Sequence, residues 1–160
     1  MILNTDQVVN FLITNNKGAK AQVGYDLTLK SLKRVNGGVV MSNKTIVSDY
    51  NDITPLSNAT GNYIFKIEPG TYSITFEQGI KLDNKHTAFI RHRSSLLRCG
   101  SIITSGVYDP GFEVDEMGAI LLATQPIILE KGARCAQILI FQSNSAEMYT
   151  GQFQGKLDLK

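Results

Sequence analysis

Residues 118–141 read GAILLATQPIILEKGARCAQILIF, and this segment sets the expected architecture. It contains three short apolar runs, Gly118–Ala123, Ile127–Leu129 and Ala136–Phe141, separated by polar residues, proline or glycine. Apolar runs this short, bounded by turn residues, are typical of β-strands rather than of helices that pack a core. The segment therefore predicts consecutive strands with no helix between them.

The same pattern extends toward the N-terminus. Turn signals such as Asn36-Gly37-Gly38 and Asp109-Pro110-Gly111 separate further short runs that contain β-branched and aromatic residues. These upstream strand candidates are Tyr25–Leu29, Gly38–Met41, Tyr63–Ile67, Tyr72–Thr75, His86–Ile90 and Ile102–Thr104. Nine short strands without intervening helices predict an all-β fold, either a β-sandwich or a β-barrel. The main expected helix is short and amphipathic and lies between Leu3 and Leu12.

The composition excludes several broad classes of protein. The chain has 160 residues, of which 42% are hydrophobic and 19% charged, and this fits one domain with a sizeable core. The net charge is only +2, so any attraction for phosphate must be local, and we expect no nucleic-acid partner. No apolar run approaches the roughly 20 residues of a membrane-spanning helix, and the N-terminus lacks a secretory signal pattern. We therefore expect a cytoplasmic protein with no membrane partner.

Two local features complete the organisation of the chain. Cys99 and Cys135 lack the spacing of a zinc site, so we expect two free and buried thiols. From Ser143 onward the sequence becomes polar, which predicts a domain over residues 1–142 and a C-terminal arm over residues 143–160.

Basic residues and hydroxyls gather between Ile90 and Arg98. Arg91, Arg93 and Arg98 lie beside Ser94 and Ser95, with no acidic residue nearby. Guanidinium groups bind phosphate oxygens in bidentate fashion, and serine hydroxyls donate further hydrogen bonds to the same oxygens. A basic surface turn and a local anion site explain this cluster about equally well.

Two further segments carry polar groups at turns or in strands. Residues 105–112 form a predicted tight turn with Asp109 and two aromatic residues at its corner, where a carboxylate could activate a water and aromatic faces could stack on a sugar or base. A simple Asp-Pro-Gly turn is the alternative. Gln137 interrupts an otherwise apolar strand, so it must find hydrogen-bond partners, which could be structural groups or a phosphate.

Taken in order, these segments resemble the dUTPase and dCTP deaminase superfamily. The strongest element is Arg93-Ser94-Ser95-Leu96-Leu97-Arg98, which is similar to the RSSLxR signature of the deaminase branch. Gly106-Val107-Tyr108-Asp109 is similar to the GxID of the third dUTPase motif, and Gly132-Ala133-Arg134-Cys135-Ala136-Gln137 to the GxRxAQ of the fourth. The likeness runs from Met1 to the segment Tyr149–Gly155, which is of deaminase type.

The resemblance implies a distorted β-barrel or jelly roll, a β-clip fold with a short N-terminal helix. It also implies a homotrimer with nucleotide sites between subunits. In this family the triphosphate is held by the positions of Arg93, Ser94, Ser95 and Gln137, while Mg²⁺ is held by the triphosphate and waters. Asp109 inherits the role of orienting the water that attacks the α-phosphate.

The remaining site roles also follow from the resemblance. Phe112 stands where an aromatic residue packs under the deoxyribose and rejects a 2′-hydroxyl. The hairpin around Ile103 to Tyr108 reads the base in this family, largely through main-chain groups. The residues expected to bind sugar and base are Ile103, Thr104, Gly106, Tyr108 and Phe112; those expected to support the site are Asp26 and Arg98; and those expected to form a lid are Tyr149, Phe153 and Gln154.

One position separates the two chemistries of the superfamily. Deaminases carry a glutamate ten residues after the third-motif aspartate to shuttle protons, and that count from Asp109 reaches Ala119. Alanine cannot transfer a proton, and loss of a general acid or base costs ~10²- to 10⁴-fold in rate. A shifted strand register could bring Glu116 into this role instead. The glycine-rich fifth motif of trimeric dUTPases is missing, so closure over the γ-phosphate must differ.

The expected function is hydrolysis of dUTP to dUMP and pyrophosphate, which is a dUTP diphosphatase activity. The alternatives are a dCTP deaminase, a bifunctional dCTP deaminase and dUTPase, and a catalytically silent trimer of the same fold. This chemistry requires that, in the assembled oligomer, Asp109 lies beside the α-phosphate of a nucleotide bound by Arg93, Ser94 and Gln137.

Overall fold

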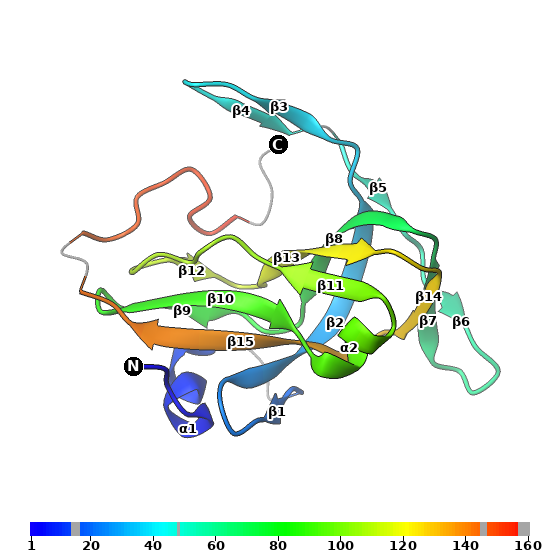
Figure 1. Ribbon diagram of the computed structural model, residues 1–160, viewed down its shortest axis with the longest axis horizontal. Coiled ribbons are helices and arrows are strands. Elements are labelled where there is room, and N and C mark those ends of the chain that lie inside the picture. Colours follow the sequence, from blue (N-terminus) through cyan, green and yellow to red (C-terminus); the bar gives the residue numbers. More distant parts are fainter. Residues whose placement is uncertain (14–16, 48, 145–146, 157–160) are drawn as a thin grey trace.

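Six antiparallel strands close into a barrel that forms the wall of the molecule (Figure 1). The computed structural model describes residues 1–13, 17–47, 49–144 and 147–156. Around the barrel the strands follow the order β2, β15, β10, β11, β13, β8, and pairing of β2 with β8 closes the ring. Their bounds are β2 Tyr25–Arg34, β8 Gly70–Phe76, β10 His86–His92, β11 Ser101–Thr104, β13 Gly118–Ala123 and β15 Arg134–Gln142.

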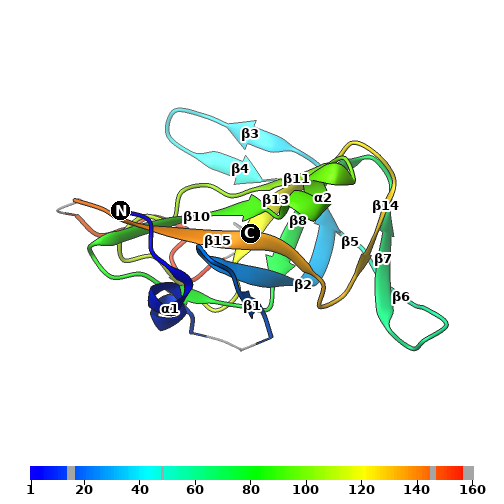
Figure 2. The ribbon, with the colours of Figure 1, turned by 60° about the horizontal axis from the view of Figure 1, so that its bottom comes forward.

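Smaller elements decorate this barrel. β1 (Ala19–Lys20) and β5 (Asn51–Asp52) pair with β2, and β9 (Ile80–Lys81) pairs with β12 (Glu113–Val114). The strands β6 (Leu56–Ser57), β7 (Tyr63–Ile67) and β14 (Ile127–Glu130) form a sheet at one end, while the hairpin of β3 (Gly38–Val40) and β4 (Thr45–Val47) projects from the barrel in both views (Figures 1 and 2). The helices are α1 (Thr5–Val8), η1 (Val9–Phe11), a 3-10 turn, and α2 (Ser94–Arg98).

Alternation of side chains builds the core. Along β15 the side chains of Ala136, Ile138 and Ile140 are fully buried inside the barrel, whereas Gln137 and Leu139 between them are only partly buried. Successive residues of a strand point to opposite faces, so Gln137 and Leu139 face outward here. The inward residues of the other strands complete one continuous apolar core.

The all-β barrel with a short N-terminal helix is confirmed, and each of the nine predicted strands is present. Several are longer than predicted, because β2 and β15 continue beyond their apolar stretches through pairing with neighbours. The sequence prediction missed α2 and strands of two or three residues such as β1 and β12. Strands that short have no periodicity to detect and depend on tertiary pairing.

The N-terminal helix is shorter than its predicted segment. Asn4 caps α1 through a capping box, in which its side chain accepts from the backbone N–H of Gln7 and the Gln7 side chain accepts from that of Asn4. After Val8 the turn tightens into η1 and the chain becomes extended at Leu12. Only the four residues of α1 are therefore α-helical.

The expectation of two buried thiols is confirmed for Cys135 and wrong for Cys99. Cys135 is buried in the barrel, and burial raises the pKa of its thiol to about 12. Cys99 is exposed because it follows the last residue of α2, at the surface end of that helix. Among the described residues, no helix is both long and apolar enough to cross a lipid bilayer.

We expect Gly24→Ala to destabilise the fold more than Gly61→Ala does. Both glycines have positive φ, +73° and +81°, which costs an alanine roughly 1–2 kcal/mol. A Cβ on Gly24 would also lie 2.2 Å from the carbonyl oxygen of Ile138, whereas one on Gly61 meets nothing within 4 Å. The collision adds about 1–3 kcal/mol. Chemical denaturation of the two variants measures the difference, and equal losses would contradict the close packing of this turn against β15.

Candidate functional site

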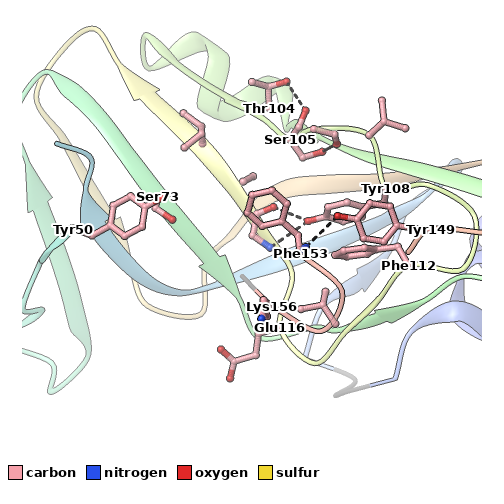
Figure 3. Close-up of a pocket in the computed structure, with 16 residues that line it drawn as sticks. Tyr50, Ser73, Thr104, Ser105, Tyr108, Phe112, Glu116, Tyr149, Phe153 and Lys156 are labelled. Carbon is pink, nitrogen blue, oxygen red and sulfur yellow. Dashed lines mark hydrogen bonds between the residues drawn. The ribbon is translucent and has the colours of Figure 1, made fainter. Parts of the chain in front are cut away.

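A pocket of about 380 Å³ opens on the outer face of β13. Its floor is formed by Gly118, Ala119 and Ile120, and the turn at residues 104–108 forms one side. The C-terminal tail contributes Tyr149 and Phe153. Figure 3 shows Tyr108, Phe112, Tyr149 and Phe153 gathered at one end of this pocket, with Tyr50 and Ser73 toward the other. The volume lies within the range of small-molecule sites.

Tyr108 anchors the turn to two barrel strands. Its backbone N–H and carbonyl exchange hydrogen bonds with Ala88 of β10, at 2.7 and 2.9 Å. Its hydroxyl donates to the carbonyl oxygen of Gly118 at 2.6 Å and accepts from the Gly118 N–H at 3.3 Å. Burial raises the pKa of Tyr108, so the hydroxyl keeps the proton it donates. The turn is thereby fixed to the start of β13, where the pocket floor begins.

Aromatic rings extend from this anchor to the tail. The rings of Tyr108 and Phe112 stack with centroids 4.9 Å apart and an interplanar angle of 17°. Tyr149 meets Phe112 at 5.4 Å and 72°, an edge arrangement that aromatic pairs favour. The tail thus packs directly on the residue pair next to Asp109.

Hydrogen bonds hold the tail to the same turn. The Tyr149 N–H donates to the carbonyl of Pro110 at 2.7 Å, and the Gln154 side-chain amide donates to that of Gly111 at 2.9 Å. Gly155 donates to the carbonyl of Glu113 at 2.9 Å, while the Glu113 N–H donates to the Gln154 side-chain oxygen at 3.2 Å. In Figure 1 the tail accordingly runs beside β12.

A second group of polar residues lies on β2, β15 and the start of α2. The buried carboxylate of Asp26 forms ion pairs with Arg93, whose Nε lies 3.1 Å away, and with Arg134, of which one guanidinium nitrogen lies 3.6 Å away. Arg93 donates a hydrogen bond to the carbonyl oxygen of Arg134 at 3.1 Å. Burial raises the pKa of Asp26 although both arginines oppose the change. Asp26 thus holds two cations together at the surface.

The other predicted phosphate ligands lie close to this pair. Ser94 and Ser95 are exposed on α2, directly after Arg93, and Arg98 is exposed at the other end of that helix. Gln137 pairs across strands with Asp26, and its side-chain amide donates to the carbonyl of Val23. The amide oxygen is left to accept. Arg134 was not singled out from the sequence, although the fourth motif contains it.

The pocket and the cationic group face opposite directions. β15 and β13 are three strands apart either way around the six-stranded ring. Gln137 on β15 and Ile120 on β13 both point outward, because their neighbours Ile138 and Leu121 are fully buried. Within one chain, the structure therefore does not bring the predicted phosphate ligands to the pocket.

The remaining predicted residues divide between the two regions and the core. Thr104, Gly106, Tyr108 and Phe112 line the pocket, whereas the Ile103 side chain is fully buried in the core. Asp109 is exposed at the corner beside the pocket, on the turn that Tyr108 anchors.

Two pocket residues bear on whether this site could transfer the protons that deamination requires. Ala119 lies in the floor and supplies no proton-transferring group. Glu116 also lines the pocket, and its carboxylate is paired with Lys30. The described residues contain no group of three or more His, Cys, Asp or Glu side chains that could hold a metal ion.

We expect Asp26→Asn to change how stability depends on pH. Since burial raises the pKa of Asp26 above 3.8, the folded state binds the proton more tightly than the unfolded state does. The contribution of Asp26 to stability is therefore largest below pH 3.8 and falls as pH rises through the raised pKa.

Urea denaturation of the wild type and the variant across this interval measures the effect. The wild type should lose stability relative to Asp26→Asn as pH rises, and Asp52→Asn on exposed β5 controls for the loss of one acid. A wild type that instead gains stability relative to the variant would show that the arginines outweigh burial.

Comparison with known proteins identifies the family of this chain. The family model described as dCTP deaminase-like matches residues 5–143. The deoxyuridine 5′-triphosphate nucleotidohydrolase of Methanocaldococcus jannaschii is 26% identical over 157 residues, covering 98% of this chain and 100% of that protein. A probable deoxyuridine 5′-triphosphate nucleotidohydrolase of Halobacterium salinarum is 27% identical over 133 residues, 82% of this chain and 80% of the relative.

A solved structure shares the fold. The 2′-deoxycytidine 5′-triphosphate deaminase from Agrobacterium tumefaciens superposes with a TM-score of 0.61 at 15% identity, over 87% of this chain. This chain covers 48% of that structure, so it spans about half its length. Because the family model matches most of the chain, the chain belongs to the dCTP deaminase-like family.

Proposed function

We propose that this chain hydrolyses dUTP to dUMP and pyrophosphate. The observation that carries the proposal is the pocket on β13, which joins aromatic walls and the neighbouring carboxylate of Asp109 to a floor residue, Ala119, that cannot move a proton. Relatives named as dUTP nucleotidohydrolases support the same substrate over nearly the whole chain.

We further propose that a complete site forms between copies in a homotrimer. The cationic group on β2 and β15 faces away from the pocket on β13, so one copy can present its arginines to the pocket of the next. Contacts between unlike faces generate a ring when the rotation closes. Ile102 and Leu122, paired outward on β11 and β13, are 37% and 43% exposed and offer apolar surface for such contacts.

The proposed mechanism uses groups from two copies. Arg93, Ser94, Ser95 and Gln137 of one copy bind the triphosphate of a nucleotide seated in the neighbouring pocket, and Arg98 lies at the edge. Asp26 orients Arg93 from beneath. Asp109 accepts a proton from a water whose oxygen forms the new bond to the α-phosphorus. The bond from that phosphorus to the oxygen bridging to the β-phosphate breaks, and pyrophosphate leaves.

The base, the tail and the metal ion complete the proposal. Main-chain groups at 103–108 read the base, and the arm, residues 143–160, acts as a lid over residues 1–142 through Tyr149, Phe153 and Gln154. We propose that Mg²⁺ arrives on the triphosphate, where it would neutralise phosphate charge.

A panel of dUTP, dCTP and dTTP, with pyrophosphate and ammonia measured separately, tests the reaction. We expect pyrophosphate from dUTP and no ammonia from dCTP, because Ala119 cannot shuttle a proton. Glu116 makes a bifunctional deaminase the alternative, since its carboxylate lines the pocket. Ammonia that disappears in Glu116→Gln would establish that alternative, whereas failure to hydrolyse any of these nucleotides would favour a silent trimer.

We expect Asp109→Asn to bind dUTP but to lose ~10²- to 10⁴-fold in turnover, because the amide cannot accept the proton. Arg93→Ala should lose binding of the triphosphate instead. Steady-state kinetics with calorimetric binding of a non-hydrolysable dUTP analogue measure both changes. Full activity of Asp109→Asn would remove Asp109 from the mechanism.

Mixing these two variants tests whether copies share a site. After equal amounts are refolded together, about one quarter of the sites should combine an intact Asp109 with an intact Arg93 from a neighbour. Activity should then recover to about that fraction of wild type. No recovery despite mixed oligomers, shown by native mass spectrometry, would place both groups in one chain.

A further inference from the structure

The backbone pairing of β9 with β12 continues beyond both strands toward Asp109. The N–H of Leu82 donates to the carbonyl of Phe112 at 2.9 Å, in the same register as the strand pairs. One step further, the N–H of Gly111 donates to the carbonyl of Asp83, also at 2.9 Å. Asp83 is therefore the last residue of this ladder, and Asp109 lies just beyond its end on the opposite segment.

The side chain of Asp83 fixes the backbone at the end of the ladder. Its carboxylate accepts from the N–H of Lys85 at 2.8 Å, which closes a local turn. The same oxygen lies 2.7 Å from Nδ1 of His86, which is the donor because an ionised carboxylate only accepts. Desolvation raises the pKa of Asp83, but the hydrogen bonds from His86 and Lys85 lower it below its usual value. The carboxylate is therefore ionised at neutral pH.

His86 connects this turn to the barrel. It is the first residue of β10, at the end where that strand pairs with β15. Its ring packs against the ring of Phe11 in η1, with centroids 4.7 Å apart and an interplanar angle of 56°. The His86 side chain is only 16% exposed, so the imidazole holds Asp83 from a packed position.

The turn that carries Asp109 is thus tied to β10 on both sides. Before Asp109, Tyr108 exchanges backbone hydrogen bonds with that strand. After Asp109, Gly111 donates to Asp83, which His86 holds to the first residue of the same strand. A catalytic group that is displaced by about 1 Å can cost about 10²-fold in rate. Both connections therefore bear on the geometry of a carboxylate at this corner.

We propose that Asp83 and His86 are positioning residues for Asp109: the Asp83 carboxylate, held by His86, fixes the carbonyl to which Gly111 is bonded. This inference rests on the proposed function, because it assumes that Asp109 activates the attacking water. The Asp83 side chain is 50% exposed, and exposed ion pairs contribute little to stability. The pair therefore matters more for the geometry of the turn than for the stability of the fold.

The test separates turnover from binding in the full chain. We expect Asp83→Ala to lower kcat for dUTP by about 10- to 10²-fold and to leave the calorimetric affinity for α,β-imido-dUTP unchanged. Asp83→Asn should recover most of the loss, since its amide oxygen still accepts from Lys85 and His86. Asp6→Ala is the matched control, because it removes another exposed ion pair, with Lys20, and should leave kcat unchanged.

A double variant tests whether the two residues act through one contact. His86→Ala should also lower kcat, because it removes the donor to Asp83. Its addition to Asp83→Ala should cause no further loss, since the contact is already broken. Losses that multiply would show that His86 acts independently of Asp83 and would overturn the proposed pair.

Three other results would overturn the assignment: wild-type kcat in Asp83→Ala, an Asp83→Asn variant as impaired as Asp83→Ala, or a fall in kcat matched by equal losses of affinity and of stability to urea. A wild type that fails to hydrolyse dUTP would instead refute the proposed function. Hydrogen exchange then tests the positioning without turnover. The N–H of Gly111 should exchange several-fold faster in Asp83→Ala than in the wild type or Asp6→Ala, and equal rates would contradict the proposal.

Discussion

Closure of the six-stranded barrel is the constraint on which the other features depend. When β2 pairs with β8, every strand has two neighbours and alternate side chains must point either into the core or out toward solvent. The polar residues of the motifs are then directed outward on different sides of the barrel. Gln137 and Ile120 both point outward, on strands that lie three apart in the six-stranded ring. The barrel therefore keeps the pocket on β13 apart from the cationic group on β2 and β15, and the proposed trimer would join them across copies.

One buried polar residue holds each of these two regions, the pocket turn and the cationic group. Tyr108 places its backbone on β10 and its hydroxyl on Gly118, which fixes the turn that carries Asp109. On the other side, Asp26 keeps Arg93 and Arg134 together despite their like charge. Burial of a carboxylate costs desolvation free energy, and this cost is what raises the pKa of Asp26. Under the proposed function, Asp26 would serve to prepare a cationic surface for phosphate more than to stabilise the fold.

The sequence predicted most of the wall and less of the site. Apolar runs such as Gly118–Ala123 are bounded by turn residues, and their pattern alone predicted the strands. The two-residue strands β1 and β12 form only because each has a partner strand beside it, β2 and β9. Motif order predicted Arg93, Asp109 and Gln137 as site residues, but it could not show that barrel closure sets the turn of Asp109 apart from the other two within a chain. Nor could it reveal Arg134 beside Asp26 or Tyr149 against Phe112, because both contacts join segments far apart in the sequence.

The position of the tail has a consequence for closure of the site. Its contacts with the turn are mostly to backbone groups of Pro110, Gly111 and Glu113, so they follow the turn itself rather than particular side chains. The tail and the pocket that it borders therefore belong to one chain. In the proposed trimer the arginines that bind the triphosphate come from another chain, so closing over the sugar and binding the phosphates would be separate events. A chain without the glycine-rich fifth motif would then secure the nucleoside by its own tail and leave the phosphates to its neighbour.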